Sequence, residues 1–76
     1  MPKITEIHWR IFEKFLTYIG CHFSRQKGSH RSYWKEGLKR PVVIQGKGKV
    51  PVTIIKTNLR TLDIDHNTYL QILSEL

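Results

Sequence analysis

The chain has 76 residues and a formal net charge of +7, so its length predicts one compact domain over residues 1–76 without room for a separate cofactor domain. Cys21 is the only cysteine, which excludes an intramolecular disulfide, and no residue spacing is typical of a metal site, so we expect neither a metal nor a cofactor. The absence of disulfides, of a long apolar run and of a signal-peptide pattern predicts a cytoplasmic protein that does not enter a membrane.

The first predicted element is an amphipathic helix over residues 5–19. Apolar side chains recur there at three- and four-residue spacings, from Ile7 to Ile19. Thr5 is the expected N-cap, and Gly20 stands where a helix-ending glycine belongs.

Three short strands are predicted next, over residues 21–26, 30–35 and 41–45. In the first strand, strict alternation predicts Cys21, Phe23 and Arg25 on one face and His22, Ser24 and Gln26 on the other. In the second strand, Tyr33 and Trp34 point in opposite directions, so only one of them can face the core. Residues 46–49 are expected to form a flexible basic loop.

Residues 52–62 have strand-like propensity at their start but helical spacing over the whole window, and the longer pattern favours a helix. Asp65 or His66 would cap a short last helix. The order is therefore α-β-β-β-α with a short extra C-terminal helix, which is an α+β fold. We expect a three-stranded antiparallel sheet with the helices on one face and the other face open.

The positive charge is concentrated in the middle of the chain. Residues 25–49 contain eight lysines and arginines against Glu36 alone, a net charge of +7, whereas the segments on either side are close to neutral. Such a concentration predicts a nucleic-acid or acidic-protein partner rather than a face that only keeps the protein in solution.

The most basic stretch contains the run Arg25-Gln26-Lys27-Gly28-Ser29-His30, which follows Gly20 at a short distance. This run resembles the R-Q-K-G-S-H motif of the HicA toxins, also called YcfA-like proteins, of bacterial and archaeal toxin–antitoxin modules. The resemblance implies a fold like that of double-stranded-RNA-binding domains. It also implies a ribonuclease that cuts mRNA and is held inactive by a HicB-like antitoxin.

His30 occupies the catalytic position of the motif. Histidine exchanges protons near neutral pH, and RNA supplies its own 2′-hydroxyl nucleophile, so cleavage needs no metal. Lys27 and Arg31 would steady the phosphate, Gly28 would allow close approach of the backbone, and Ser29 would donate a hydrogen bond. The full set of expected RNA-binding residues is Arg25, Lys27, Gly28, Ser29, Arg31, Lys47 and Lys49.

Other interpretations stay open at this point. Without the motif, His30 would be interpreted as a strand-edge histidine that hydrogen-bonds a neighbour. His22 is a second acid–base candidate if its face meets that of His30. The leading hypothesis is a metal-independent endoribonuclease, the toxin of a type II toxin–antitoxin module, with mRNA and a HicB-like antitoxin as partners. The alternatives are a non-catalytic RNA-binding module of the same fold and a basic protein that docks an acidic partner.

Overall fold

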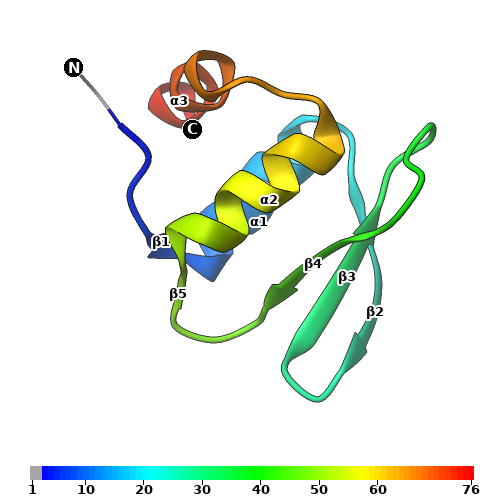
Figure 1. Ribbon diagram of the computed structural model, residues 1–76. Coiled ribbons are helices and arrows are strands. Elements are labelled where there is room, and N and C mark those ends of the chain that lie inside the picture. The colour runs from blue at the N-terminus through cyan, green and yellow to red at the C-terminus, as the bar shows by residue number, and fades with distance from the viewer. Residues whose placement is uncertain (1–2) are drawn as a thin grey trace.

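A computed structural model describes residues 3–76, which form an α+β fold of three helices and two antiparallel sheets (Figure 1). In chain order the elements are β1 (Ile7–His8), α1 (Trp9–Tyr18), β2 (His22–Lys27), β3 (His30–Trp34), β4 (Val42–Gln45), β5 (Lys49–Val50), α2 (Val52–Leu62) and α3 (His66–Glu75). The predicted class and three-stranded sheet are confirmed. The predicted bounds of the helix over residues 52–62 are those observed for α2.

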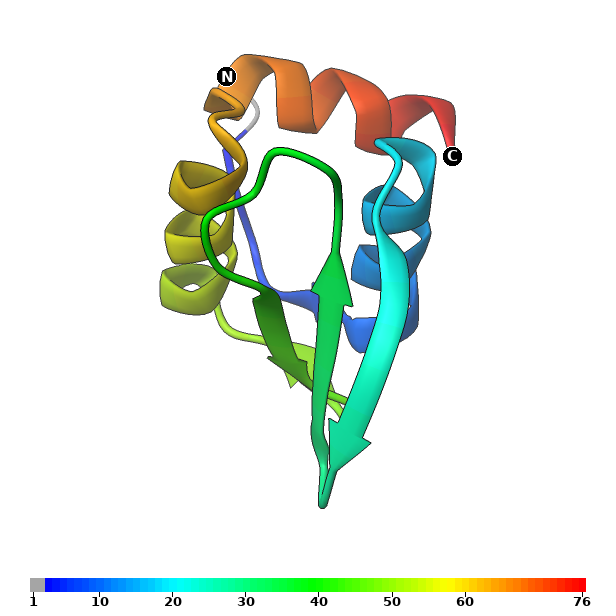
Figure 2. The same cartoon turned by 90° about the vertical axis from the view of Figure 1, so that its right-hand side faces the viewer.

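The larger sheet has the order β2-β3-β4, and α1 and α2 lie side by side on one of its faces. Figure 2 looks onto the other face, which no element covers. Contacts agree with this arrangement, since the Tyr33 hydroxyl donates to Glu13 of α1 and the Asn58 amide of α2 donates to the Val43 carbonyl. The expectation of helices on one face and an open second face is therefore confirmed.

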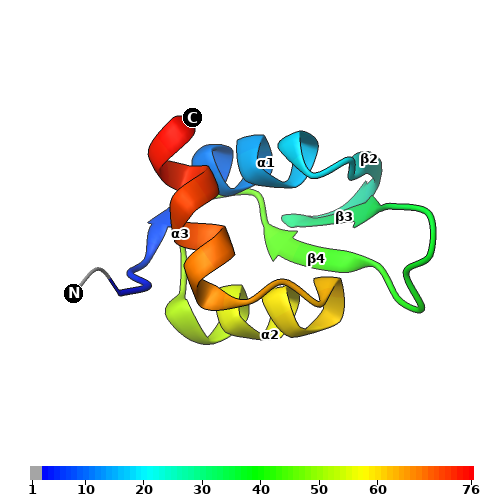
Figure 3. The ribbon, with the colours of Figure 1, turned by 90° about the horizontal axis from the view of Figure 1, so that it is seen from above.

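The third helix lies across the ends of the other two (Figure 3). Its Tyr69 is fully buried and meets Phe15 edge to face, with ring centroids 4.8 Å apart. Asp65 is the N-cap and accepts a hydrogen bond from the Thr68 N–H at 2.7 Å. With ten residues, α3 is as long as α1, so the prediction of a short last helix is wrong.

The first helix begins later than the periodicity predicts. Its N-cap is His8, whose Nδ1 accepts from the Arg10 N–H at 3.2 Å, and not Thr5. Residues 7–8 instead form β1, which pairs with β5 at residues 49–50. The expected flexible loop thus ends in a strand. Local spacing could not show this, because the partner strand lies some forty residues further along the chain.

The predicted faces of β2 are wrong beyond Phe23, because β2 contains a β-bulge at Ser24. Phe23 pairs with Tyr33 before the bulge and Arg25 pairs with Ser32 after it, so Ser24 is an extra residue on β2. From the bulge onward the alternation is reversed. Arg25 shares the open face with Ser32, and Gln26 joins the helix-side face.

Candidate nucleic-acid interface

His30 is the first residue of β3 and lies on the open face of the sheet. It pairs with Lys27 of β2 on one side and with Gln45 of β4 on the other. Arg25, which the bulge turns to this face, pairs with the next open-face residue of β3, Ser32. His30 is exposed, and none of the side-chain hydrogen bonds among residues 3–76 involves its imidazole. Both ring nitrogens therefore remain available to a ligand.

The turn before His30 is fixed by the backbone. Gly28 has φ +60°, a left-handed conformation that glycine adopts without steric cost, and its carbonyl accepts from Gln26 Nε2 at 2.9 Å. The Ser29 carbonyl accepts from the Gly46 N–H at 2.6 Å. Figure 2 shows this hairpin end extending past the helices. A ligand as large as RNA can therefore reach it from several sides.

The predicted cations do not all gather around His30. Arg25 and Lys27 share its face, and Lys47 follows Gly46, which is bonded to the turn. Lys49 lies in β5, in the other sheet, with its Nζ 3.8 Å from Glu6 Oε1. We call Arg25, Lys27, His30 and Lys47 the hairpin-end cluster.

Arg31 points to the opposite face from His30. Its NH2 group lies 2.9 Å from Glu13 Oε2, its NH1 group donates to Gln26 Oε1 at 2.8 Å, and its Nε donates to the Tyr33 hydroxyl at 3.0 Å. This geometry does not fit the expectation that Arg31 and Lys27 together steady a phosphate beside His30. The physical reason is alternation along β3, which sends adjacent side chains to opposite faces.

Aromatic rings complete the surroundings of Arg31. The guanidinium carbon lies 4.3 Å from the Phe23 ring centroid and 5.0 Å from that of Trp9. Burial, with the added hydrogen bond to Glu13, raises the pKa of Tyr33 to about 12. The hydrogen bond from Arg31 to the Tyr33 hydroxyl is also the main cause that raises the pKa of the guanidinium. Arg31 thus ties β3, β2 and α1 together.

Gly46 is the residue in the sequence that indicates the close packing around Arg31. A Cβ built there would lie 2.6 Å from Arg31 Cδ and 3.1 Å from its Cγ, so the arginine stem crosses the space that a side chain would fill. The glycine is therefore explained by close packing as well as by the loop that follows it.

The remaining candidates lie apart from His30. His22 is on the open face but pairs with Trp34, four residues along β3 and hence ~13 Å away by strand geometry. Among residues 3–76, no three His, Cys, Asp or Glu side chains are grouped as metal ligands would be. Tyr33 is buried, whereas Trp34 is half-buried, so only one of the two aromatic side chains faces the core, as predicted.

A comparison with known protein families gives one match, to the family described as the HicA toxin of bacterial toxin–antitoxin systems, over residues 9–64. No curated protein and no solved structure matches the chain. The matched segment runs from the first residue of α1 past the end of α2, so it contains the hairpin and the Arg31 network and leaves α3 outside. Within the described residues, no helix is long and apolar enough to cross a membrane. Because the match covers more than half of the sequence, the chain belongs to the HicA toxin family, and its family implies an antitoxin as partner.

Proposed function

We propose that this protein is a metal-independent endoribonuclease that cleaves mRNA, the toxin of a type II toxin–antitoxin pair, with His30 as its proton-transfer group. The observation that carries the proposal is the position of His30. Its side chain is exposed, makes no hydrogen bond within residues 3–76, and shares the open face with Arg25 and Lys27. Membership of a family whose members are generally ribonucleases supports the same conclusion.

The chemistry needs one base and a few cations. Neutral His30 removes the proton of a ribose 2′-hydroxyl, and the 2′-oxygen attacks the adjacent phosphorus. The bond from phosphorus to the 5′-oxygen breaks, and that oxygen takes a proton from the imidazolium or from water. The products are a 2′,3′-cyclic phosphate and a 5′-hydroxyl. Arg25 and Lys27 stabilise the negative charge that develops on the phosphate oxygens.

The other motif residues take supporting roles in this proposal. Lys47 contacts a neighbouring phosphate, and the Gly28–Ser29 turn lets the backbone of the RNA approach the hairpin end. Arg31 acts as a positioning residue that holds β3 against α1. Lys49, in the second sheet, adds to the general positive field rather than to the cut itself.

The antitoxin is expected to be acidic and to cover His30 and its neighbours. Charge attraction to the hairpin-end cluster would speed association. Trp34, which is half-buried on the open face, supplies an aromatic contact to the antitoxin, whereas Tyr33 is buried in the core. RNA and antitoxin should then compete, and a ternary complex with full RNA affinity would contradict this occlusion.

The proposal is tested by cleavage of single-stranded RNA in EDTA. We expect His30→Ala to lower the rate by about 10²–10⁴-fold, which is the usual contribution of a general acid–base group. His22→Ala is the matched control, since it removes a histidine from the same face and should leave the rate within about two-fold of wild type.

Three outcomes are decisive. Cleavage at the wild-type rate by folded His30→Ala would remove His30 from the mechanism. RNA binding without cleavage by the wild type would favour a non-catalytic RNA-binding module. Cleavage only after divalent metal is restored would contradict the metal-independent chemistry.

A further inference from the structure

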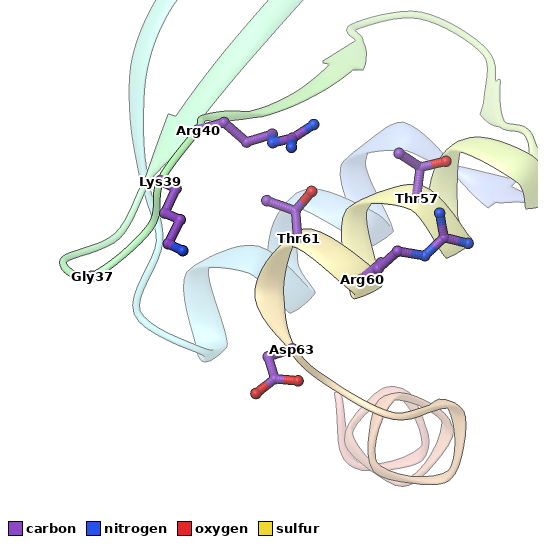
Figure 4. A pocket seen from close by; sticks show the side chains of 7 residues that line it. All are labelled: Gly37, Lys39, Arg40, Thr57, Arg60, Thr61 and Asp63. Carbon is purple, nitrogen blue, oxygen red and sulfur yellow. The ribbon is translucent and has the colours of Figure 1, made fainter.

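A second basic site lies at the far end of the sheet from His30. A cavity of about 560 Å³ lies between the segment that joins β3 to β4 and the last turns of α2 (Figure 4). It is lined by Gly37, Lys39, Arg40, Thr57, Arg60, Thr61 and Asp63, and we call it the α2 pocket. Residues 57, 60 and 61 share one side of α2 through their three- and four-residue spacing. The pocket is thus built from two separate parts of the chain.

The segment that supplies Lys39 and Arg40 is anchored. Leu38 is half-buried and packs against the core, and its N–H donates to the Lys35 carbonyl at 3.1 Å. Gly37, with φ +93°, makes the turn just before it. The two cations that follow are therefore held next to α2 and are not on a freely moving loop.

The cations of this pocket form no ion pair within residues 3–76. The ion pairs among residues 3–76 are Arg31 with Glu13 and Lys49 with Glu6, so neither Lys39 nor Arg40 nor Arg60 has a carboxylate within 4.0 Å. Asp63 also lines the cavity, but Figure 4 shows its carboxylate at the lower end, away from the Arg40 guanidinium. Three cations and the Thr61 hydroxyl line this cavity, whereas the Thr57 hydroxyl donates to the Thr53 carbonyl at 2.9 Å. Cations and free hydroxyl donors are the groups that bind an anion.

The position of the pocket relates it to His30. Strand β4 begins two residues after Arg40 and ends at Gln45, which pairs with His30. Five residues of extended chain give an offset of at most ~17 Å along β4. At ~3.4 Å between successive phosphates, the spacing along a B-DNA strand, this offset corresponds to about five nucleotides. The path must also pass the edge of β4, because α2 lies on the face opposite His30.

We propose that the α2 pocket binds a backbone phosphate of the same RNA strand that His30 cuts, about five or more nucleotides from the scissile bond. This inference rests on the proposed function and adds an extended substrate to it. The lining has no aromatic ring on which a base could stack, so the pocket recognises phosphate and not base sequence. Arg60, in the last turn of α2, also offsets the negative end of the helix dipole, which would otherwise repel an anion.

The test measures binding of 2′-O-methyl RNA, which keeps the phosphates but cannot be cut through its 2′-oxygen. Two lengths are compared, about four and about twelve nucleotides, because only the longer one spans both sites. The variants are Arg40→Ala, Arg60→Ala and their combination. Lys56→Ala is the matched control, since it removes one positive charge from the exposed surface of the same helix outside the pocket.

We expect each single pocket variant to raise the Kd of the long RNA by about 3–10-fold and to reduce the salt slope by about 0.7, the value for one lost single-strand contact. Neither variant should change the Kd of the short RNA by more than Lys56→Ala does. Amide resonances of Gly37 and Thr61 should shift with the long RNA only.

Different results would contradict the α2 pocket assignment and the proposed nuclease function. Equal effects of Arg40→Ala, Arg60→Ala and Lys56→Ala on the long RNA would overturn the pocket assignment while leaving cleavage at His30 intact. Unchanged RNA binding together with weaker binding of purified antitoxin would overturn it too and reassign the pocket to an acidic protein segment. Length-dependent loss of binding without any cleavage by the wild type would support the pocket and contradict the nuclease. No RNA binding at all would overturn both.

Discussion

Adjacent residues of β3 have very different surroundings on the two faces of the three-stranded sheet. On the helix side, Arg31 uses its Nε, NH1 and NH2 groups in hydrogen bonds to Tyr33, Gln26 and Glu13. On the open side, and within residues 3–76, the His30 side chain makes no hydrogen bond and Arg25 lies in no ion pair. A run of basic residues that looks uniform in sequence thus contains a structural arginine and a separate set of groups free to meet a ligand.

The prediction with the largest expected effect compares two neighbouring residues of β3: substitution of His30 should affect cleavage, and substitution of Arg31 should affect stability. His30→Ala should reduce RNA cleavage by about 10²–10⁴-fold and change the free energy of unfolding by less than about 0.5 kcal/mol. Arg31→Met keeps an apolar stem but removes the three hydrogen bonds that the guanidinium donates. It should therefore lower the free energy of unfolding by about 2 kcal/mol. Urea denaturation and initial cleavage rates measure the two effects.

Arg31→Lys sharpens the same comparison. Lysine keeps the charge but lacks the planar fork, so its stability should fall between that of wild type and Arg31→Met. If instead Arg31→Met were as stable as wild type and lost RNA affinity with a reduced salt slope, Arg31 would be an RNA contact and not a structural residue.

The next test uses the glycine beneath Arg31. Gly46→Ala places a Cβ against the arginine stem and should cost about 1 kcal/mol of unfolding free energy through overpacking. In an Arg31→Ala background the clash is gone, so the cost should nearly disappear. A double-mutant cycle measures this coupling, and additive effects would show that the two residues do not interact.

A separate test concerns two buried tyrosines at high pH. Burial is the main cause that raises the pKa of both Tyr33 and Tyr69 to about 12. The folded state therefore keeps these protons more tightly than the unfolded chain, whose tyrosines titrate near 10. The stability they contribute is complete below pH 10 and is lost as the pH rises from 10 to 12.

Phenylalanine variants separate the two tyrosines. The Tyr69 hydroxyl is buried without a hydrogen-bond partner among residues 3–76, so Tyr69→Phe should change neutral-pH stability by less than about 1 kcal/mol. Tyr33→Phe should be less stable at neutral pH, because it removes the bonds to Glu13 and Arg31. Both should lose less stability between pH 10 and 12, and an unchanged alkaline profile would contradict this assignment.

The parts of the fold that local patterns determine were predictable. Apolar residues Ile55, Leu59 and Leu62 repeat along α2 at helical spacing and are buried. The hairpin followed from the glycine-containing turn before His30, and the opposite directions of Tyr33 and Trp34 followed from strand alternation.

The parts that depend on distant partners were not predictable. Pairing of β1 with β5 is set by residues far apart in sequence, so the start of α1 was placed too early. The role of Arg31 depends on Glu13, eighteen positions away, and charge alone placed it with the RNA-binding residues. The α2 pocket was missed for the same reason, since Arg40 and Arg60 are brought together only by the packing of α2 beside β4.

Because Ser24 lies between Phe23 and Arg25, only the bulge at Ser24 keeps two like charges apart. Were the pairing regular beyond Phe23 and Tyr33, Arg25 would stand directly opposite Arg31, and two guanidiniums would compete for Glu13. The insertion places an uncharged amide, Gln26, against Arg31 and frees Arg25 for the solvent side. Deleting Ser24 would remove the bulge but leave Arg25 opposite Ser32 and Gln26 opposite Arg31, so the two arginines would stay on separate faces and only the local twist of β2 would change.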